Sequence, residues 1–279
     1  MTAACNIAAA QVGRSPETFE TFADWCVSQE ELMPEAQHTV EALLEEAGTQ
    51  DCDRAGEILT NLQELDLSSS EIVNIAPLAS LTNLTKLSLW NNQIADVTPL
   101  AHLTKLTELN LGSNQITDVS PLAALISLTE LILGTNRIVE MTDPIEHNPS
   151  INQITDVAPL ASLTNLTGLN LASNQITDVS PLADLTNLTE LSLWNNQITD
   201  VTPLAELTNL TGLNLANNQI TNVNPLAELT NLSILDLGSN RITDVTPLAE
   251  LTNLTALILL DTLVSDRTCP VQPAAICQF

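Results

Sequence analysis

Apolar residues recur through most of the chain in a unit of 22 residues. The unit is clearest at residues 185–206, LTNLTELSLWNNQITDVTPLAE, and neighbouring units repeat it almost letter for letter. Leu191 and Leu193 have the two-residue spacing that directs side chains to one face of a β-strand. Ile198 and Val201 then return apolar side chains to the interior after a turn, and a proline fixes φ at the next bend. Each unit therefore predicts one coil.

One coil cannot bury its own leucines, but stacked coils can. A period in the low twenties with the pattern L-x-x-L-x-L-x-x-N-x-I is typical of leucine-rich repeats. We therefore predict an α/β repeat solenoid over residues 61–264, in which each strand pairs with the next to form a parallel sheet.

An asparagine follows the strand in almost every unit. Its amide both donates and accepts hydrogen bonds, so a column of amides can pair the buried backbone groups of its own turn and of the neighbouring turn. Each such group left unpaired costs roughly 1–3 kcal/mol. We predict a structural ladder of Asn92, Asn114, Asn136, Asn152, Asn174, Asn196, Asn218 and Asn240.

A second polar column has two interpretations. Its members are Asp96, Asp118, Asp156, Asp178, Asp200 and Asp244, with Asn74 and Asn222 in register. Each side chain can accept backbone N–H bonds at the start of a short helical turn. Alternatively, carboxylates stacked about 4.8 Å apart could bind Ca²⁺. The two asparagines favour capping, and we expect no cofactor or metal.

The period fails once. Asn136 and Asn152 are 16 residues apart, and residues 137–151 form an irregular repeat without an L-x-x-L-x-L strand. The sheet must either skip from residues 131–133 to residues 169–171 or bridge them with a degenerate coil. The break is either a functional loop or hinge, or a scar of recombination or of a short frameshift. It contains His147, one of three histidines.

Residues 15–60 predict a helical N-terminal cap. Ser15-Pro16-Glu17 has the composition of a helix start, Pro34 opens a second helix that Gly48 ends, and Asp51 caps a third. Trp25 is expected inside this cap, which would cover the open end of the leucine core.

The two ends outside these regions are short. Residues 265–279 predict a looped C-terminal cap. Residues 1–14 are expected to be disordered or a residual leader, because they lack the basic region of a signal peptide. Cys5 stays open between a free thiol, a lipidated residue and a remnant of a truncated leader.

The remaining four cysteines lie in the two caps. Their placement predicts two disulfides, Cys26–Cys52 and Cys269–Cys277, each worth roughly 2–4 kcal/mol. Paired caps indicate an oxidising compartment, so we expect an extracytoplasmic, secreted or cell-surface protein.

Charge excludes several partners. The formal net charge is −27, with seven Lys and Arg against 34 Asp and Glu. Nucleic-acid binders carry basic stripes, so we expect no nucleic acid. No run of about 18 apolar residues is present, so we expect no membrane span. We expect a monomer.

The outward strand positions form the concave face, the broadest surface of the predicted solenoid. Two of them carry Trp where most units carry Gly or Ala, which is typical of a binding hot spot or of a copied unit without a selected role. The predicted binding residues are Trp90, Trp194, Glu108, Glu130, Glu190, Asn110, Asn170, Asn214 and Asp236.

Enzyme motifs are absent. His38, His102 and His147 are scattered, and no nucleophile–base set or phosphate-binding loop is present. We therefore expect a protein that is not an enzyme. The N-L-T triplets match glycosylation sequons, but their Asn and Thr are repeat positions that need no such explanation.

The unit N-x-I-T-D-V-x-P-L-A-x-L-T-N-L-T resembles the internalin-type leucine-rich repeats of bacteria. The flanks, F-A-D-W-C…A-G-T-Q-D-C at residues 22–52 and C-P-V-Q-P-A-A-I-C at residues 269–277, look like the caps of cyanobacterial proteins of this group. The resemblance covers residues 15–279. It implies a curved solenoid with strands on the concave side and short 3₁₀ turns on the convex side. It also implies an exported or surface binding protein, since internalins bind host receptors through the concave face.

Together these observations predict a non-enzymatic protein–protein interaction module that binds a partner on the concave face. The alternative is a glycan- or cell-wall-binding surface protein, although two separated tryptophans offer few stacking platforms for sugars.

Overall fold

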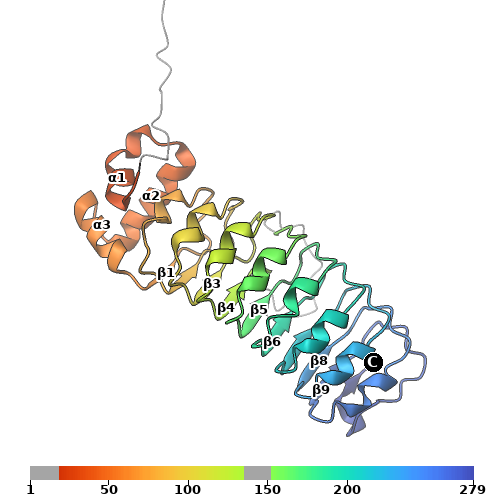
Figure 1. Cartoon of the computed structure of the whole chain (residues 1–279). Coiled ribbons are helices and arrows are strands. Elements are labelled where there is room, and N and C mark those ends of the chain that lie inside the picture. Colours follow the sequence, from red (N-terminus) through yellow and green to blue (C-terminus); the bar gives the residue numbers. More distant parts are fainter. Residues whose placement is uncertain (1–18, 135–151) are drawn as a thin grey trace, which may run out of the picture.

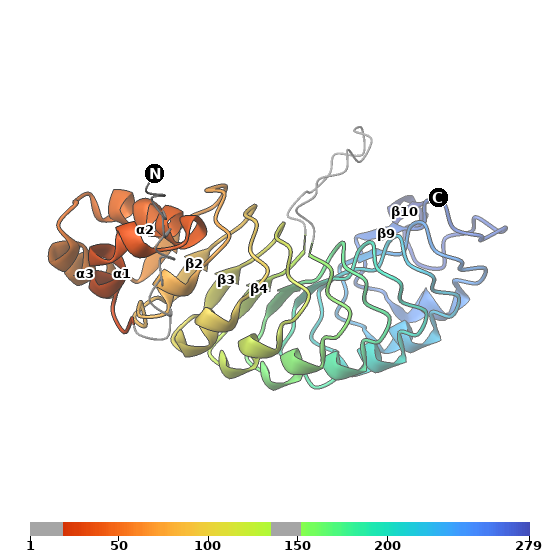
Figure 2. The same ribbon diagram turned by 90° about the horizontal axis from the view of Figure 1, so that it is seen from above.

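The computed structural model describes residues 19–134 and 152–279. These residues form a curved rod in which ten strands make one parallel sheet in chain order (Figure 1). Figure 2 shows the arc, with the short helices along its outer edge and the strands inside. The predicted α/β repeat solenoid is confirmed.

Every strand is short and pairs with the next in register, position for position. The strands are β1 (Glu64–Asp66), β2 (Lys86–Ser88), β3 (Glu108–Asn110), β4 (Glu130–Ile132), β5 (Gly168–Asn170), β6 (Glu190–Ser192), β7 (Gly212–Asn214), β8 (Ile234–Asp236), β9 (Ala256–Ile258) and β10 (Cys277–Gln278).

The convex side carries a 3₁₀ helix in each coil, with proline at its second position. These helices are Ala76–Leu78, Thr98–His102, Ser120–Ala124, Ala158–Ser162, Ser180–Leu182, Thr202–Glu206, Asn224–Glu228 and Thr246–Glu250. The preceding Asp or Asn accepts the N–H of the first helical residue, as Asp200 does from Thr202 at 2.8 Å. The same bond forms at Asn74, Asp96, Asp118, Asp156, Asp178, Asn222 and Asp244. The capping interpretation is confirmed.

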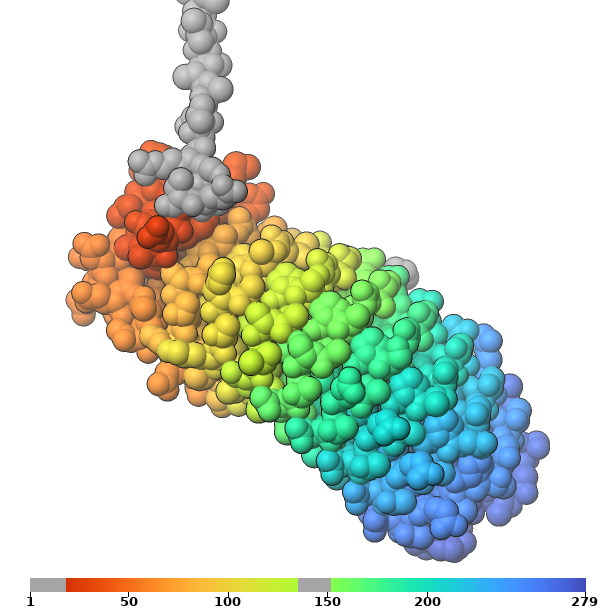
Figure 3. All heavy atoms as spheres, in the orientation of Figure 1, coloured from red at the N-terminus to blue at the C-terminus, as the bar shows by residue number. Residues whose placement is uncertain are grey.

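The interior is a stack of aliphatic side chains. In the unit quoted above, Leu193, Ile198 and Leu204 are fully buried, and Leu191 and Val201 are at most 2% exposed. Because each coil buries its leucines against its neighbours, the core runs along the rod as one body. Figure 3 shows the outer surface of the rod, on which the sequence colours of successive coils follow one another from end to end.

The asparagine ladder is present at every predicted position that the structure describes. Asn196 donates to the carbonyls of Leu193 in its own coil, at 3.1 Å, and of Leu171 in the preceding coil, at 3.0 Å. Its Oδ1 accepts the N–H of Ile176 at 3.0 Å. One amide thus pairs three backbone groups in two coils. The same set of bonds forms at Asn92, Asn114, Asn152, Asn174, Asn218 and Asn240.

The irregular repeat does not interrupt the sheet. β4 pairs directly with β5, so the sheet skips the break and the alternative of a degenerate bridging coil is wrong. Asn152 donates to the carbonyls of Leu133 and Leu111 and accepts the N–H of Ile116. It therefore holds the ladder position between Asn114 and Asn174. Asn136 and His147 lie outside the described residues.

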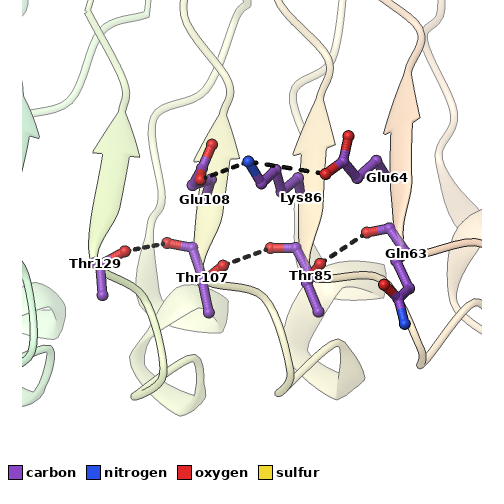
Figure 4. Close-up of polar contacts among 7 residues, drawn as sticks. All are labelled: Gln63, Glu64, Thr85, Lys86, Thr107, Glu108 and Thr129. Atoms are coloured by element: carbon purple, nitrogen blue, oxygen red, sulfur yellow. Dashed lines mark hydrogen bonds and ion pairs between the residues drawn. The ribbon is translucent and has the colours of Figure 1, made fainter.

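A second ladder, which sequence reasoning left as unexplained repeat positions, joins the residues before each strand. The Thr107 hydroxyl donates to the Thr85 carbonyl, and Thr129 donates to Thr107 (Figure 4). The ladder continues at every following coil. The sequon asparagines also bond across coils, for example Asn187 to the Thr164 carbonyl at 2.8 Å. The N-L-T triplets are therefore a device for stacking coils.

The N-terminal cap contains α1 (Phe22–Val27), α2 (Pro34–Ala47) and α3 (Cys52–Asn61), with a 3₁₀ turn at Gln29–Glu31. The predicted starts of the second and third helices and the stop at Gly48 are confirmed. The predicted first start, at residues 15–17, lies outside the described residues. The first described helix begins at Phe22, after the non-helical Phe19–Thr21, and Thr21 forms a capping box with Asp24.

The cap is fastened to the first coil by polar and apolar contacts. From α2, Thr39 donates to the Asn74 carbonyl at 2.6 Å and His38 Nε2 lies 2.7 Å from the Ser70 carbonyl oxygen. Trp25 is buried, as predicted, with its ring 4.6 Å from that of Phe19. The Cys26–Cys52 disulfide joins α1 to α3.

The C-terminal cap adds a strand that the sequence did not predict. After the 3₁₀ turn Ala274–Ile276, β10 pairs in parallel with β9. The predicted Cys269–Cys277 disulfide is formed. Thr262, at the position of the ladder asparagine, donates to the Leu259 carbonyl at 2.7 Å and so keeps one of its bonds. No helix in the described part of the chain is long and apolar enough to cross a membrane.

Candidate binding surface

The concave face is hollowed in two adjoining places. The N-terminal hollow lies over β1–β4, has a volume of about 600 Å³ and includes Glu64, Lys86, Glu108, Glu130 and Ile132. The C-terminal hollow lies over β4–β9 and has a volume of about 570 Å³. Glu130 and Ile132 on β4 line both, so the two hollows form one continuous surface.

The N-terminal hollow carries a row of one lysine between two glutamates. Lys86 Nζ lies 2.9 Å from Glu108 Oε1 and 3.8 Å from Glu64 Oε1, so one ammonium bridges two flanking strands (Figure 4). The hydrogen bond that Lys86 donates to Glu108 raises the pKa of Lys86, with a smaller contribution from Glu64. These side chains are about half exposed or more, so the row adds little to stability. The row holds the three charged groups in fixed positions on this part of the concave face.

In the C-terminal hollow, glutamates lie across glycines. A Cβ built on Gly168 would lie 1.8 Å from Glu130 Oε2, and one built on Gly212 would lie 1.9 Å from Glu190 Oε2. Each carboxylate therefore occupies the space that a side chain on the next strand would need. The sequence contained the signal, since Glu130 and Gly168, like Glu190 and Gly212, share one register column, but it was not recognised.

The polar residues that end the strands accept hydrogen bonds from the turn that follows. Oδ1 of Asn110, Asn170 and Asn214 accepts the N–H two residues later, at 2.9–3.1 Å. Asp236 accepts from Gly238 in the same way at 3.0 Å, and burial raises the pKa of this carboxyl group. All four line the hollows. These four side chains therefore fix the turn that follows each strand and also form part of the concave surface.

Trp90 and Trp194 differ from the expectation of exposed anchors. Both are only partly exposed, and neither lines either hollow. A Cβ on Gly112 would lie 3.3 Å from Trp90 Cδ1, so the indole lies against the small residue of the next coil. The Trp90 indole nitrogen is buried without a hydrogen-bond partner. The small residues of this column make room for the ring.

The described residues contain no cluster of side chains suited to a metal ion. Across residues 19–134 and 152–279, no three His, Cys, Asp or Glu side chains gather where they could hold a metal ion.

The geometry of coils, ladders and caps defines a leucine-rich repeat protein. The family model "Leucine Rich repeats (2 copies)" matches residues 60–102, 104–147, 150–184, 186–228 and 208–250. Among solved structures, internalin C2 of Listeria monocytogenes is 41% identical with a TM-score of 0.68, over 78% of this chain and 91% of that chain. An internalin (inlF) of the same species is 34% identical with a TM-score of 0.65, over 85% and 72%.

The chain belongs to the bacterial internalin-type leucine-rich repeat proteins. The ectodomain of the plant membrane receptor kinase GASSHO1/SCHENGEN3 from Arabidopsis thaliana shares the fold, at 21% identity and a TM-score of 0.62, over 82% of this chain and 26% of that chain. No curated protein matches the chain in sequence.

Proposed function

We propose that this chain is a non-enzymatic interaction module that binds a protein partner on its concave face. The observation that carries the proposal is the continuous surface formed by the two hollows, whose side chains stand in fixed register on nine strands. A rigid, concave surface with few mobile loops lowers the entropy lost on binding. Membership of the internalin-type family supports the same conclusion.

We also propose that the protein works outside the cytoplasm. Each cap is closed by a disulfide, and disulfides persist in oxidising compartments. The similar internalins support this location.

The alternative, a glycan-binding protein, gains no support from the tryptophans. Sugar sites present exposed aromatic faces, whereas Trp90 and Trp194 are partly buried and outside the hollows. A glycan array probed with the same variants as below separates the two functions.

The experiment is affinity capture from the surface and secreted fractions of the native organism. Ser88→Arg places a long cation in the N-terminal hollow, and Ile234→Arg does so in the C-terminal hollow. The matched control is Ile126→Arg, since Ile126 is 57% exposed, comparable with 49% for Ile234, but lies outside both hollows. Trp90→Ala with Trp194→Ala tests the predicted anchors.

We expect one protein to be captured by the wild type and by Ile126→Arg and lost with at least one concave variant. Identical capture by all variants would contradict concave binding. If capture is lost only with the double tryptophan variant, the partner binds at the edge of the sheet near the tryptophans instead of in the hollows.

A further inference from the structure

We propose that the C-terminal hollow receives a basic segment of the partner protein. Two Lys or Arg side chains of that segment pair with Glu130 and Glu190, and an aliphatic side chain beyond the second of them packs on Ile234. This inference rests on the proposed function and names the chemistry of the partner.

The two carboxylates are held by one repeated device. Glycine on the following strand leaves room for the carboxylate, as described above, and a threonine hydroxyl holds one of its oxygens. Thr167 Oγ1 lies 3.1 Å from both Glu130 Oε1 and the Thr129 carbonyl oxygen, and Thr211 Oγ1 lies 2.9 Å from Glu190 Oε1 and 3.1 Å from the Thr189 carbonyl oxygen. Each hydroxyl shares its one hydrogen between the ladder carbonyl and the carboxylate. Each carboxylate is thus positioned before a ligand arrives, which lowers the entropic cost of binding.

Their spacing is set by the sheet. Glu130 on β4 and Glu190 on β6 stand in one register column with β5 between them. Two strand spacings separate the two glutamates by roughly 10 Å along this column. Such a separation suits two basic side chains about two turns apart on a helix, or on an extended segment, and is too long for one small cation to bridge.

The carboxylates of Glu130 and Glu190 are free to form ion pairs with a partner protein. Within the part of the chain that the structure describes, the ion pairs are those of Lys86 with Glu64 and Glu108, in the other hollow. Neither Glu130 nor Glu190 pairs with a basic side chain there. The surrounding protein carries a net charge of −27, which repels acidic partners and attracts basic ones.

The hollow also has an apolar floor, which a simple cation would leave unused. Ile132, Ile234 and Ile258 line it together with Gly168 and Gly212. Ile234, the first residue of β8, is 49% exposed and stands two strands beyond Glu190 in the same register column. An aliphatic side chain that follows the basic group paired with Glu190 would bury it. Burial of apolar area is worth roughly 25 cal/mol per Å².

The test uses a displayed library of random peptides selected against the full chain. Selected peptides are then measured for Kd on two double variants. Glu130→Gln with Glu190→Gln removes both charges. Gly168→Ala with Gly212→Ala keeps every charge but displaces both carboxylates, because only the flexible end of each glutamate must move.

Each double variant has a matched control. Glu206→Gln with Glu228→Gln removes two charges from the ends of convex 3₁₀ helices. Gly56→Ala introduces a methyl group in α3, where its nearest neighbour would lie at an ordinary 3.6 Å.

We expect selected peptides rich in Lys or Arg beside Leu, Ile or Val. Their Kd should rise about tenfold or more with the double glutamine variant, several-fold with the double alanine variant, and less than about twofold with the controls. Peptides without a basic excess, or an unchanged Kd in the double glutamine variant, would overturn the inference.

The same panel separates this failure from failure of the proposed function. Peptides that lose affinity with Ser88→Arg but not with the double glutamine variant would refute the basic-segment inference and leave concave binding in place. Peptides indifferent to Ser88→Arg, Ile234→Arg and the double glutamine variant would refute both.

Discussion

Single side chains in this solenoid serve two coils at once, so their loss costs more than one contact. Asn196 illustrates the point, because its amide pairs the Leu171, Leu193 and Ile176 backbone groups and is itself 8% exposed. Unlike a surface asparagine, it has no solvent to replace these partners.

Asn196→Ala should lower the free energy of unfolding by about 2–5 kcal/mol, because three backbone groups lose a partner inside the protein. Thermal and urea unfolding measure the change. Gln197→Ala, at the exposed neighbouring position, is the control and should have little effect. An Asn196→Ala protein as stable as the control would refute the ladder's energetic role.

The capping aspartates make stability depend on pH. Hydrogen bonds from the hydroxyls of Ser120, Thr202 and Thr246 hold the pKa of Asp118, Asp200 and Asp244 below the usual 3.8, with added contributions from backbone N–H groups. The native state therefore binds fewer protons than the unfolded state. The stabilisation is complete above the unfolded pKa and is lost as pH falls through the lowered native pKa.

Replacing these three aspartates by Asn, the residue found at positions 74 and 222, should flatten the fall of Tm as pH drops below about 4. Because all three carboxylates are solvent-exposed, the change per site should be small, so Tm must be followed across the whole acid range. Asp184→Asn with Glu206→Gln and Glu228→Gln removes three exposed charges elsewhere. An equal flattening in that control would show that net charge, rather than capping, sets the acid limit.

At the scale of the element, the coil that contains the irregular repeat is closed by Asn152. Its bonds to Leu133 and Leu111 are those that every other ladder asparagine makes with its own and the preceding coil. The 16 residues from Asn136 to Ile151 are therefore an addition to a coil that is complete without them.

Deleting residues 136–151 joins Thr135 to Asn152 and restores the spacing of Ser113 and Asn114 in the preceding coil. We expect the shortened protein to fold with an equal or higher Tm, since closing a loop of this length costs roughly 2 kcal/mol of chain entropy. Circular dichroism melting tests this. A large loss of stability would mean that the deleted residues support the neighbouring coils.

The break also shows where sequence reasoning stopped. Counting asparagines located the irregularity, and both Asn136 and Asn152, which each precede an Ile two residues later, were predicted to join the ladder. The bonds of Asn152 to Leu133, Leu111 and Ile116 place it there, whereas Asn136 lies outside the described residues. In the cap, the predicted helix start at residues 15–17 also lies outside the described residues, and the first described helix begins after the capping box of Thr21 and Asp24.

At the scale of the whole molecule, the sequence predicted the sheet, its register, the asparagine ladder and both disulfides, because a strict repeat makes each of these a matter of counting. The threonine ladder was not predicted. Surface exposure was harder. Whether Trp90 is exposed depends on Gly112 beside it, and whether Glu130 lies flat depends on Gly168. In both pairs the two residues belong to adjacent coils, and an interpretation of one repeat unit at a time does not compare residues of adjacent coils.

Because every strand pairs with the next in register, the concave face can evolve only in fixed steps. The distance between two groups in one column is always a whole number of strand spacings. Duplicating one unit between Glu130 and Glu190 would lengthen their separation by a single step of about 4.8 Å, with nothing in between available. Descendants that gain or lose units between the two glutamates would therefore bind ligands whose charged groups are separated by different whole numbers of strand spacings.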